Sequence, residues 1–145
     1  MDDLSAAEYR ALAEFRFQIR SFLRFSEDQA RACGIEPQQH QLLLAIRGLP
    51  ENRRATIGEL AARMQLKHHS TVELVDRLEA RGAVARVHGG EDHRKVLVRL
   101  TRSGAGLLRK LSVVHHEELD HTGPRLARAL RALRSLRKRE KALAA

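Results

Sequence analysis

Aromatic side chains and cysteine are scarce in this chain of 145 residues. Tryptophan is absent, and the aromatic residues together make up 3% of the sequence. Proteins that bind single-stranded nucleic acid need aromatic platforms on which bases stack, so the composition argues against that class. The single cysteine, Cys33, excludes an intramolecular disulfide framework and fits a reducing compartment.

Long apolar runs are missing as well. No stretch approaches the length that crosses a bilayer, and the acidic start "MDDLSAAEYR" lacks the apolar core of a secretion signal. We therefore expect a cytoplasmic protein that does not enter membranes. No Ser-His-Asp order, phosphate-binding loop or pair of buried carboxylates indicates catalysis, so the sequence predicts neither an enzyme nor a cofactor.

Positive charge is what the sequence has in excess. Lysine and arginine outnumber aspartate and glutamate by 27 to 18, which gives a formal net charge of +9, and 43% of the residues are hydrophobic. The apolar content suffices for a core. An excess of this size most often accompanies an anionic partner, with nucleic acid first and anionic membrane second. The alternative is that the charge only keeps the protein soluble, and the placement of the basic residues must decide.

Apolar residues recur at spacings of three and four over most of the chain, which predicts helices. Thr56 is the expected N-cap of one of these helices, with Glu59 completing a capping box. Thr101 is the expected cap of another, and Gly123-Pro124 predicts a break before the last helix. The expected helices cover residues 4–32, 37–46, 57–64, 69–81, 102–121 and 125–143.

After Gly82 the apolar period changes from about 3.6 to 2. The runs "AVARV" and "VLVRL" read as strands, joined by "HGGEDHRK" as a hairpin with a long flexible tip. Two short helices, a tight turn and a hairpin make a winged helix-turn-helix, whose second helix enters the major groove of DNA.

Two sets of side chains are the predicted DNA contacts. The exposed side of the helix over 69–81 and the turn before it offers His68, His69, Ser70, Glu73 and Arg77. The hairpin carries His88, Arg94 and Lys95 near its tip, where a minor groove with its negative potential would attract arginine. A solvated helix face is the alternative for the helix alone, and the charged hairpin favours DNA.

The stretch from Ile57 to Gly104 resembles the MarR-type winged-helix transcriptional regulators. The motifs that carry the resemblance are Leu60-Ala61, Asp76-Arg77-Leu78-Glu79 with Gly82, Asp92-x-Arg94, and Leu100-Thr101 with Gly104. Any one of these motifs is weak, and their order and spacing together are specific. "IEPQQHQLLLAI" also looks like the family's second helix, with Glu36 where threonine is usual.

The resemblance implies a homodimer that binds a pseudo-palindromic DNA operator. It implies one MarR-like domain over 1–145, mainly α with a small β-hairpin wing. The winged-helix part would cover about 35–104, and 1–34 and 105–145 would form dimerisation helices. Arg94 would be the wing-tip arginine, with Asp92 as its orienting carboxylate. The apolar sides expected to hold the dimer are those of Phe15, Ile19 and Phe22 and of Leu126, Leu130 and Leu133.

Several residues are candidates for sensing a signal. Relatives release DNA when a small molecule binds, and Phe22, Phe25 and His40 are plausible pocket residues, with core packing as the alternative. Cys33 could sense oxidants, and the alternative is a small buried residue. "HHEELDH", His115 to His121, offers zinc-type ligands, and a polar outer face is the favoured alternative.

The sequence therefore predicts a sequence-specific regulator, a dimeric repressor released by a small molecule or by stress. The rivals are an architectural DNA-binding protein without an effector, a regulator that senses redox state or metal through Cys33 or His115 to His121, and a metalloenzyme built around "HHEELDH". Arginines at steps of three in the last helix form either a solvated face or an added attraction for phosphate. They are Arg125, Arg128, Arg131, Arg134 and Arg137.

Overall fold

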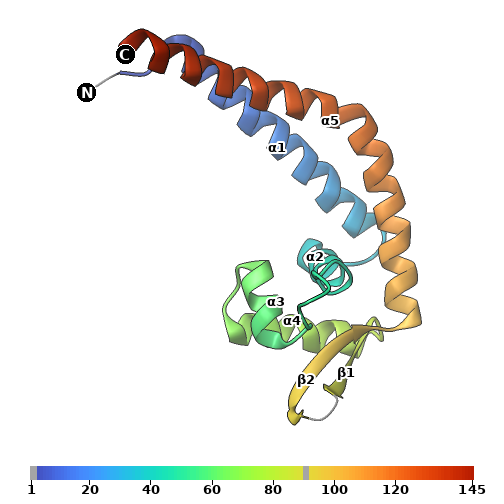
Figure 1. Cartoon of the computed structure of the whole chain (residues 1–145). Coiled ribbons are helices and arrows are strands. Elements are labelled where there is room, and N and C mark those ends of the chain that lie inside the picture. Colours follow the sequence, from blue (N-terminus) through green and yellow to red (C-terminus); the bar gives the residue numbers. More distant parts are fainter. Residues whose placement is uncertain (1–2, 90–91) are drawn as a thin grey trace. The chain divides into compact units, whose positions relative to one another are not determined.

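The computed structural model describes residues 3–89 and 92–145, with the side chains of 92–94 left outside the description. Within these described residues, five helices and one two-stranded antiparallel hairpin follow one another (Figure 1), which confirms the predicted fold class. The elements are α1 Ala6–Ala32, α2 Pro37–Arg47, α3 Ile57–Met64, α4 His68–Ala80, β1 Val84–Gly89, β2 Asp92–Leu100 and α5 Arg102–Ala144.

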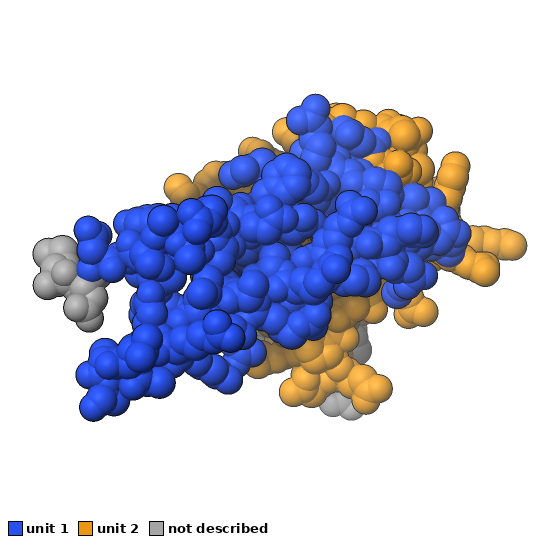
Figure 2. Space-filling view, turned by 90° about the horizontal axis from the view of Figure 1, so that it is seen from above, with its two compact units in different colours: residues 1–28, 113–145 blue, residues 29–112 orange. Residues whose placement is uncertain are grey.

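The chain divides into two compact units, coloured separately in Figure 2. Unit 1 consists of residues 1–28 and 113–145, which contain most of α1 and most of α5. Unit 2 consists of residues 29–112, which contain α2, α3, α4 and the hairpin.

Unit 2 has a closed apolar core. Every one of its helices, both strands and the start of α5 contribute buried side chains. Burying a leucine or valine completely stabilises the fold by about 1.5–3 kcal/mol, so this cluster is the main stabilising element of the unit. Its largest members are Ile35, Leu42, Leu43, Leu60, Leu74, Val75, Leu78, Val84, Val98, Leu108 and Leu111.

The junctions between elements follow the predicted caps. The Glu59 amide donates to the Thr56 hydroxyl at 3.1 Å, and the Gly104 amide donates to the Thr101 hydroxyl at 3.1 Å. Gly104 is required by a close approach, because a methyl group there would overlap the Ala83 carbonyl oxygen. The Glu59 carboxylate faces Arg63 and Arg53 at 3.3 and 3.8 Å, so ion pairs replace the second half of the expected capping box.

The predicted break at Gly123-Pro124 is wrong. α5 runs unbroken from Arg102 to Ala144, with Pro124 inside it (Figure 1). A proline inside a helix removes one hydrogen bond and crowds the carbonyl four residues earlier, which costs about 3 kcal/mol. In unit 1 the helix meets α1 on both sides of Pro124, through His115 and Arg137, and this packing outweighs the lost bond.

The long hairpin tip was also a wrong prediction. The strands extend beyond "AVARV" and "VLVRL", and the ladder continues from Val84↔Leu100 through His88↔Val96 to Gly89↔Asp92. A register shift between His88 and Gly89 places extra residues on β2, which is the arrangement of a bulge. Moreover, the Val98 amide donates to the Ala55 carbonyl at 2.9 Å, and Thr56 bridges Leu97. The loop "ENRRA", residues 51–55, therefore ends in a third short pairing to the sheet.

Unit 1 is built differently, from α1 and the second part of α5 lying side by side (Figure 1). Two of its interhelix contacts are polar. His115 Nε2 lies 2.8 Å from Ser26 Oγ, and an Arg137 nitrogen lies 3.3 Å from a Glu8 carboxylate oxygen. Between these contacts a groove of about 410 Å³ is lined by Glu14, Gln18, Arg125, Arg128, Ala129 and Ala132. No helix in the described part of the chain is long and apolar enough to cross a membrane.

Candidate nucleic-acid interface

The predicted recognition helix is α4. Its inner side is buried by Thr71, Leu74, Val75 and Leu78, and the Thr71 hydroxyl donates to the Lys67 carbonyl at 3.0 Å. These residues recur at spacings of three and four, so the opposite side of the helix faces solvent. On that side His68, His69, Glu73 and Arg77 are exposed and Ser70 is half-buried.

The arrangement at the start of α4 suits an anionic partner. Lys67 occupies the N-cap position without a side-chain cap, and two histidines follow directly. The first amides of a helix lack partners within it and carry partial positive charge. This end of α4 can therefore hold a phosphate or an acceptor atom of a base edge.

The hairpin places a second group of predicted residues. His88 on β1 and Lys95 on β2 are both exposed. The Asp92 and Arg94 side chains lie outside the described residues, and their backbones belong to β2. His88 pairs with Val96 in the ladder, so His88 and Lys95 lie close to each other along the hairpin.

A brace between the recognition helix and the hairpin was missed by the sequence reasoning. Arg86 on β1 contacts Asp76 Oδ1 at 2.6 Å and Glu79 Oε1 at 2.8 Å, both on α4. The Arg86 amide also donates to Glu79 Oε2 at 3.0 Å. Partial burial by itself lowers the pKa of Arg86, but the two carboxylates outweigh this and raise it. These contacts fix the orientation of the hairpin relative to α4.

The signal for this brace was present in the sequence. Asp76 and Glu79 lie three apart on a helix, and Arg86 follows on a strand after the tight turn at Gly82, which has a φ of +76°. Residues three apart share a helix face, so both carboxylates can reach one guanidinium. What the pattern could not supply is the direction in which β1 leaves the turn.

A basic loop before α3 was also left without a role. Arg53 and Arg54 are exposed directly before the N-cap Thr56. Arg53 pairs with Glu59 at 3.8 Å. A basic pair at the start of the first helix of the motif can contact the phosphate backbone, where this helix crosses it.

The sensor candidates divide between the two units. Phe22 and Phe25 lie in unit 1 with their rings edge-on to His115, at centroid distances of 6.0 and 5.5 Å. His40 lies in unit 2, where it is 2% exposed on α2. Cys33 is half-buried and packs against the core of unit 2, which is the structural role weighed for it above.

The stretch from His115 to His121 makes a polar contact to α1 and another within α5. His115 meets Ser26, and His121 Nδ1 lies 3.0 Å from the Glu117 carbonyl oxygen of the previous turn. Among the residues that the structure describes, no group of three histidine, cysteine or carboxylate side chains is placed to hold a metal ion.

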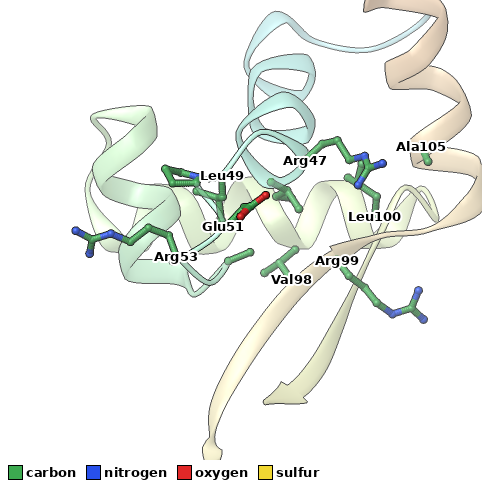
Figure 3. A pocket seen from close by; sticks show the side chains of 11 residues that line it. Arg47, Leu49, Glu51, Arg53, Val98, Arg99, Leu100 and Ala105 are labelled. Atoms are coloured by element: carbon green, nitrogen blue, oxygen red, sulfur yellow. The ribbon is translucent and has the colours of Figure 1, made fainter. Parts of the chain in front are cut away.

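A pocket of about 540 Å³ lies in unit 2, beside the hairpin (Figure 3). Its lining includes the apolar residues Leu49, Val98 and Leu100 and the charged residues Arg47 and Glu51. In Figure 3 the guanidinium groups of Arg53 and Arg99 point away from it. The lining contains none of the three residues predicted to form an effector pocket.

Comparison with known proteins identifies the winged-helix part. Residues 34–95 match the model of the MarR family. An uncharacterised HTH-type transcriptional regulator of Bacillus subtilis, YfiV, is 34% identical over 83 residues, which are 57% of this chain. The match covers 49% of YfiV, so the chain spans about half the length of this curated relative.

Solved structures share the fold. AbsC, a MarR family transcriptional regulator from Streptomyces coelicolor, has a TM-score of 0.72 at 18% identity, over 98% of this chain and 99% of AbsC. A mutant MarR from E. coli, complexed with operator DNA, has a TM-score of 0.63 at 24% identity, over 83% and 89%. S. aureus MepR in a DNA complex has a TM-score of 0.60 at 23% identity, over 84% and 97%. The family model, the curated relative and the winged-helix fold agree, and residues 34–95 of this chain are similar to the MarR family.

Proposed function

We propose that this protein is a sequence-specific DNA-binding transcriptional regulator. The observation that carries the proposal is α4, which buries its apolar side in unit 2 and exposes the predicted polar side to solvent. Two solved relatives with this fold are complexes with DNA. In the proposed complex α4 enters the major groove and the hairpin follows the minor groove.

The side chains divide by the part of DNA that they would touch. Ser70 and Arg77 on α4 would read base edges, where a hydroxyl and a guanidinium can donate to purine acceptors. Lys95 on the hairpin and Arg54 before α3 would contact phosphates, which positions the protein without reading sequence. Arg94, with Asp92 beside it in sequence, would be the wing-tip arginine that the family resemblance implies.

The proposed active form is a homodimer on a pseudo-palindromic operator. One winged helix makes too few contacts to select a single site, and two half-sites double them. Unit 1 supports the proposal, because it exposes large apolar side chains on both of its helices. Among them are Tyr9, Leu12, Phe17 and Leu23 on α1 and Leu119 and Leu130 on α5.

The helix faces predicted to form the dimer interface are mostly covered within one protomer. Phe15, Ile19, Phe22, Leu126 and Leu133 are half-buried within one protomer, and only Leu130 of the predicted set is exposed, at 41%. The neighbouring side of α1, which carries Leu12 and Phe17, is therefore proposed as part of the dimer surface.

Repression in the cytoplasm and release by a small molecule complete the proposal. The MarR family consists of regulators, and no enzymatic activity is proposed. The rival is an architectural DNA-binding protein without an effector. The braced and exposed α4 favours the regulator, because a protein that only coats DNA has no need to hold a recognition helix in a fixed orientation.

The deciding experiment is selection from a random duplex library followed by titration of the selected site and a scrambled site. Each neutralised phosphate steepens the fall of log affinity with log salt by about 0.9, so a dimer should give a slope steeper than about −4. We expect a palindrome with half-site centres about 10 base pairs apart.

Two variants separate the proposed roles in the same titration. Ser70→Ala should change base preference, and Lys95→Ala should weaken binding to all sequences alike. Uniform coating of both duplexes by the wild type would favour the architectural rival. A change of base preference in Lys95→Ala with none in Ser70→Ala would overturn the assignment of α4 to bases.

A further inference from the structure

Charge is distributed unevenly along unit 1. Residues 125–141, in the last turns of α5, contain eight basic residues and one acidic residue, a formal net charge of +7. The rest of unit 1 contains four basic and nine acidic residues, a formal net charge of −5. The excess positive charge of this unit is therefore confined to one helical segment.

Seven of the eight basic side chains of this segment form no ion pair in the part of the chain that the structure describes. All eight are exposed. Arg137 alone has internal partners, Glu8 at 3.3 Å and Glu140 at 3.8 Å. The other seven have no carboxylate within ion-pair distance among the described residues. They are Arg125, Arg128, Arg131, Arg134, Lys138, Arg139 and Lys141.

The geometry of the helix gathers them on its outer side. Leu126, Ala129 and Leu133 recur at spacings of three and four and are buried or half-buried, so they mark the side that packs inward. Turning 100° per residue, Arg128, Arg131, Arg134, Lys138 and Arg139 fall on the remaining arc. From Arg128 to Arg139 this arc runs along about 17 Å of helix, at 1.5 Å per residue.

We propose that the outer side of residues 125–141, the basic face, binds the phosphate backbone of duplex DNA independently of α4 and the hairpin. Six of the eight basic residues are arginines, whose planar guanidinium matches the geometry of phosphate. This contact goes beyond the proposed function, since it needs no operator and no recognition helix. It would hold the regulator on DNA of any sequence.

An anionic membrane fits the same segment less well. Helices that lie on membranes place tryptophan, phenylalanine or leucine on an apolar side that enters the lipid. Residues 125–141 contain no aromatic residue, and Leu130 is the one large apolar side chain of the segment that is exposed. This surface can therefore attract negative charge, but it has few apolar side chains to insert into a bilayer.

The test compares two full-length variants that lose the same charge. One carries Arg128→Gln, Arg131→Gln, Arg134→Gln and Lys138→Gln. The matched control carries Arg10→Gln, Arg16→Gln, Arg20→Gln and Arg24→Gln, four exposed arginines of α1 in the same unit. The probe is a duplex of scrambled sequence titrated over a range of salt. Circular dichroism and sedimentation check that fold and assembly are kept.

The basic-face variant should bind the scrambled duplex at least about tenfold more weakly, with a salt slope shallower by roughly three. The α1 control should keep affinity and slope close to those of the wild type. Equal losses in both variants would show a simple effect of net charge and would overturn the proposal. Unchanged binding in the basic-face variant, or a change in dimer dissociation alone, would also overturn it.

Two further measurements separate this proposal from membrane binding and from operator binding by α4 and the hairpin. The four substitutions could abolish binding to phosphatidylserine vesicles and leave DNA binding unchanged. That result would assign the surface to membranes and overturn the proposal. A Ser70→Ala, Arg77→Ala variant, which changes only the side chains proposed to read bases, should lose preference for the selected site and keep binding to the scrambled duplex. If the wild type shows no preferred site, the proposed regulator fails while the loss in the basic-face variant still decides the present proposal.

Discussion

The two compact units of this protein bury their side chains in opposite ways. Unit 2 holds all thirteen residues of the buried apolar cluster, and Leu44 is its one large hydrophobic residue that the structure describes as exposed. Unit 1 buries Ala129, Glu8 and Ser26, and exposes nine large hydrophobic side chains in its described part. Thus the unit with the recognition helix is closed, and the unit with the longest helices is open.

This difference shows what each unit needs in order to be stable. Unit 2 removes its apolar surface from water within one chain, which is the dominant stabilising term in folding. Unit 1 leaves such surface in solvent, and exposed apolar patches of this kind mark sites of association. A second copy of the chain is the partner that we propose for it.

The largest expected effect is a truncation in the core of unit 2. Leu78 is 0% exposed, so Leu78→Ala should lower the free energy of unfolding by about 2–5 kcal/mol, through lost burial and the cavity left behind. Leu143→Ala, on a residue 88% exposed in unit 1, is the matched control. Urea titration of both variants at one protein concentration measures the contrast. Equal losses would remove the distinction between a closed and an open unit.

The next effect concerns assembly. Leu12→Asp with Phe17→Asp would place two charges on the open surface, at residues 43% and 56% exposed, and should convert a dimer to a monomer. Analytical ultracentrifugation at micromolar concentration gives the mass. Leu44→Asp, at a residue 45% exposed in unit 2, should leave the dimer intact. A monomeric wild type, or a monomer produced equally by Leu44→Asp, would contradict the proposed surface.

A smaller effect is expected at the brace of unit 2. Arg86→Ala removes contacts to Asp76 and Glu79 and should reduce stability by about 0.5–1.5 kcal/mol, since the three side chains are partly exposed. It should also weaken binding to the selected operator, because α4 is no longer tied to the wing. Arg63→Ala, which removes one exposed pair with Glu59, is the control. If Arg63→Ala and Arg86→Ala reduce operator affinity equally, the brace does not position α4.

The smallest effect lies in the polar contact between the helix ends of unit 1. A hydrogen bond from Glu140 to Glu8 raises the pKa of Glu140 and, together with the Ser5 amide, lowers the pKa of Glu8. The stability that protonated Glu140 contributes is present at acidic pH and is lost as pH rises through its raised pKa. The pKa of Glu8 is lowered, so the stability that its carboxylate contributes is present above its ordinary pKa and is lost as pH falls through the lowered pKa.

Glu140→Gln keeps a donor to Glu8 at every pH. Its melting temperature should therefore exceed that of the wild type slightly at neutral pH, and the gap should close in acid. Glu117→Gln, an exposed residue of α5, is the control for loss of a charge. A gap that is constant from acidic to neutral pH would exclude a shared proton.

Local rules of the chain were enough for several features. The helix over Ile57–Met64 follows from its apolar spacing and its Thr56 cap, and both lie where the sequence predicted them. The exposed side of α4 follows from the spacing of its buried residues. Caps and helical periods depend on residues within a turn or two of one another, so the sequence alone contains the necessary information.

Other features depend on which segments meet, and only the tertiary structure decided them. α5 passes through Pro124 because α1 holds it on both sides, although the dipeptide Gly123-Pro124 locally favours a break. The brace at Arg86 and the pairing of Ala55 with Val98 join residues that lie in different elements. The energies of such contacts depend on distances that no local pattern specifies, so the same sequence signals permit either outcome until the elements pack.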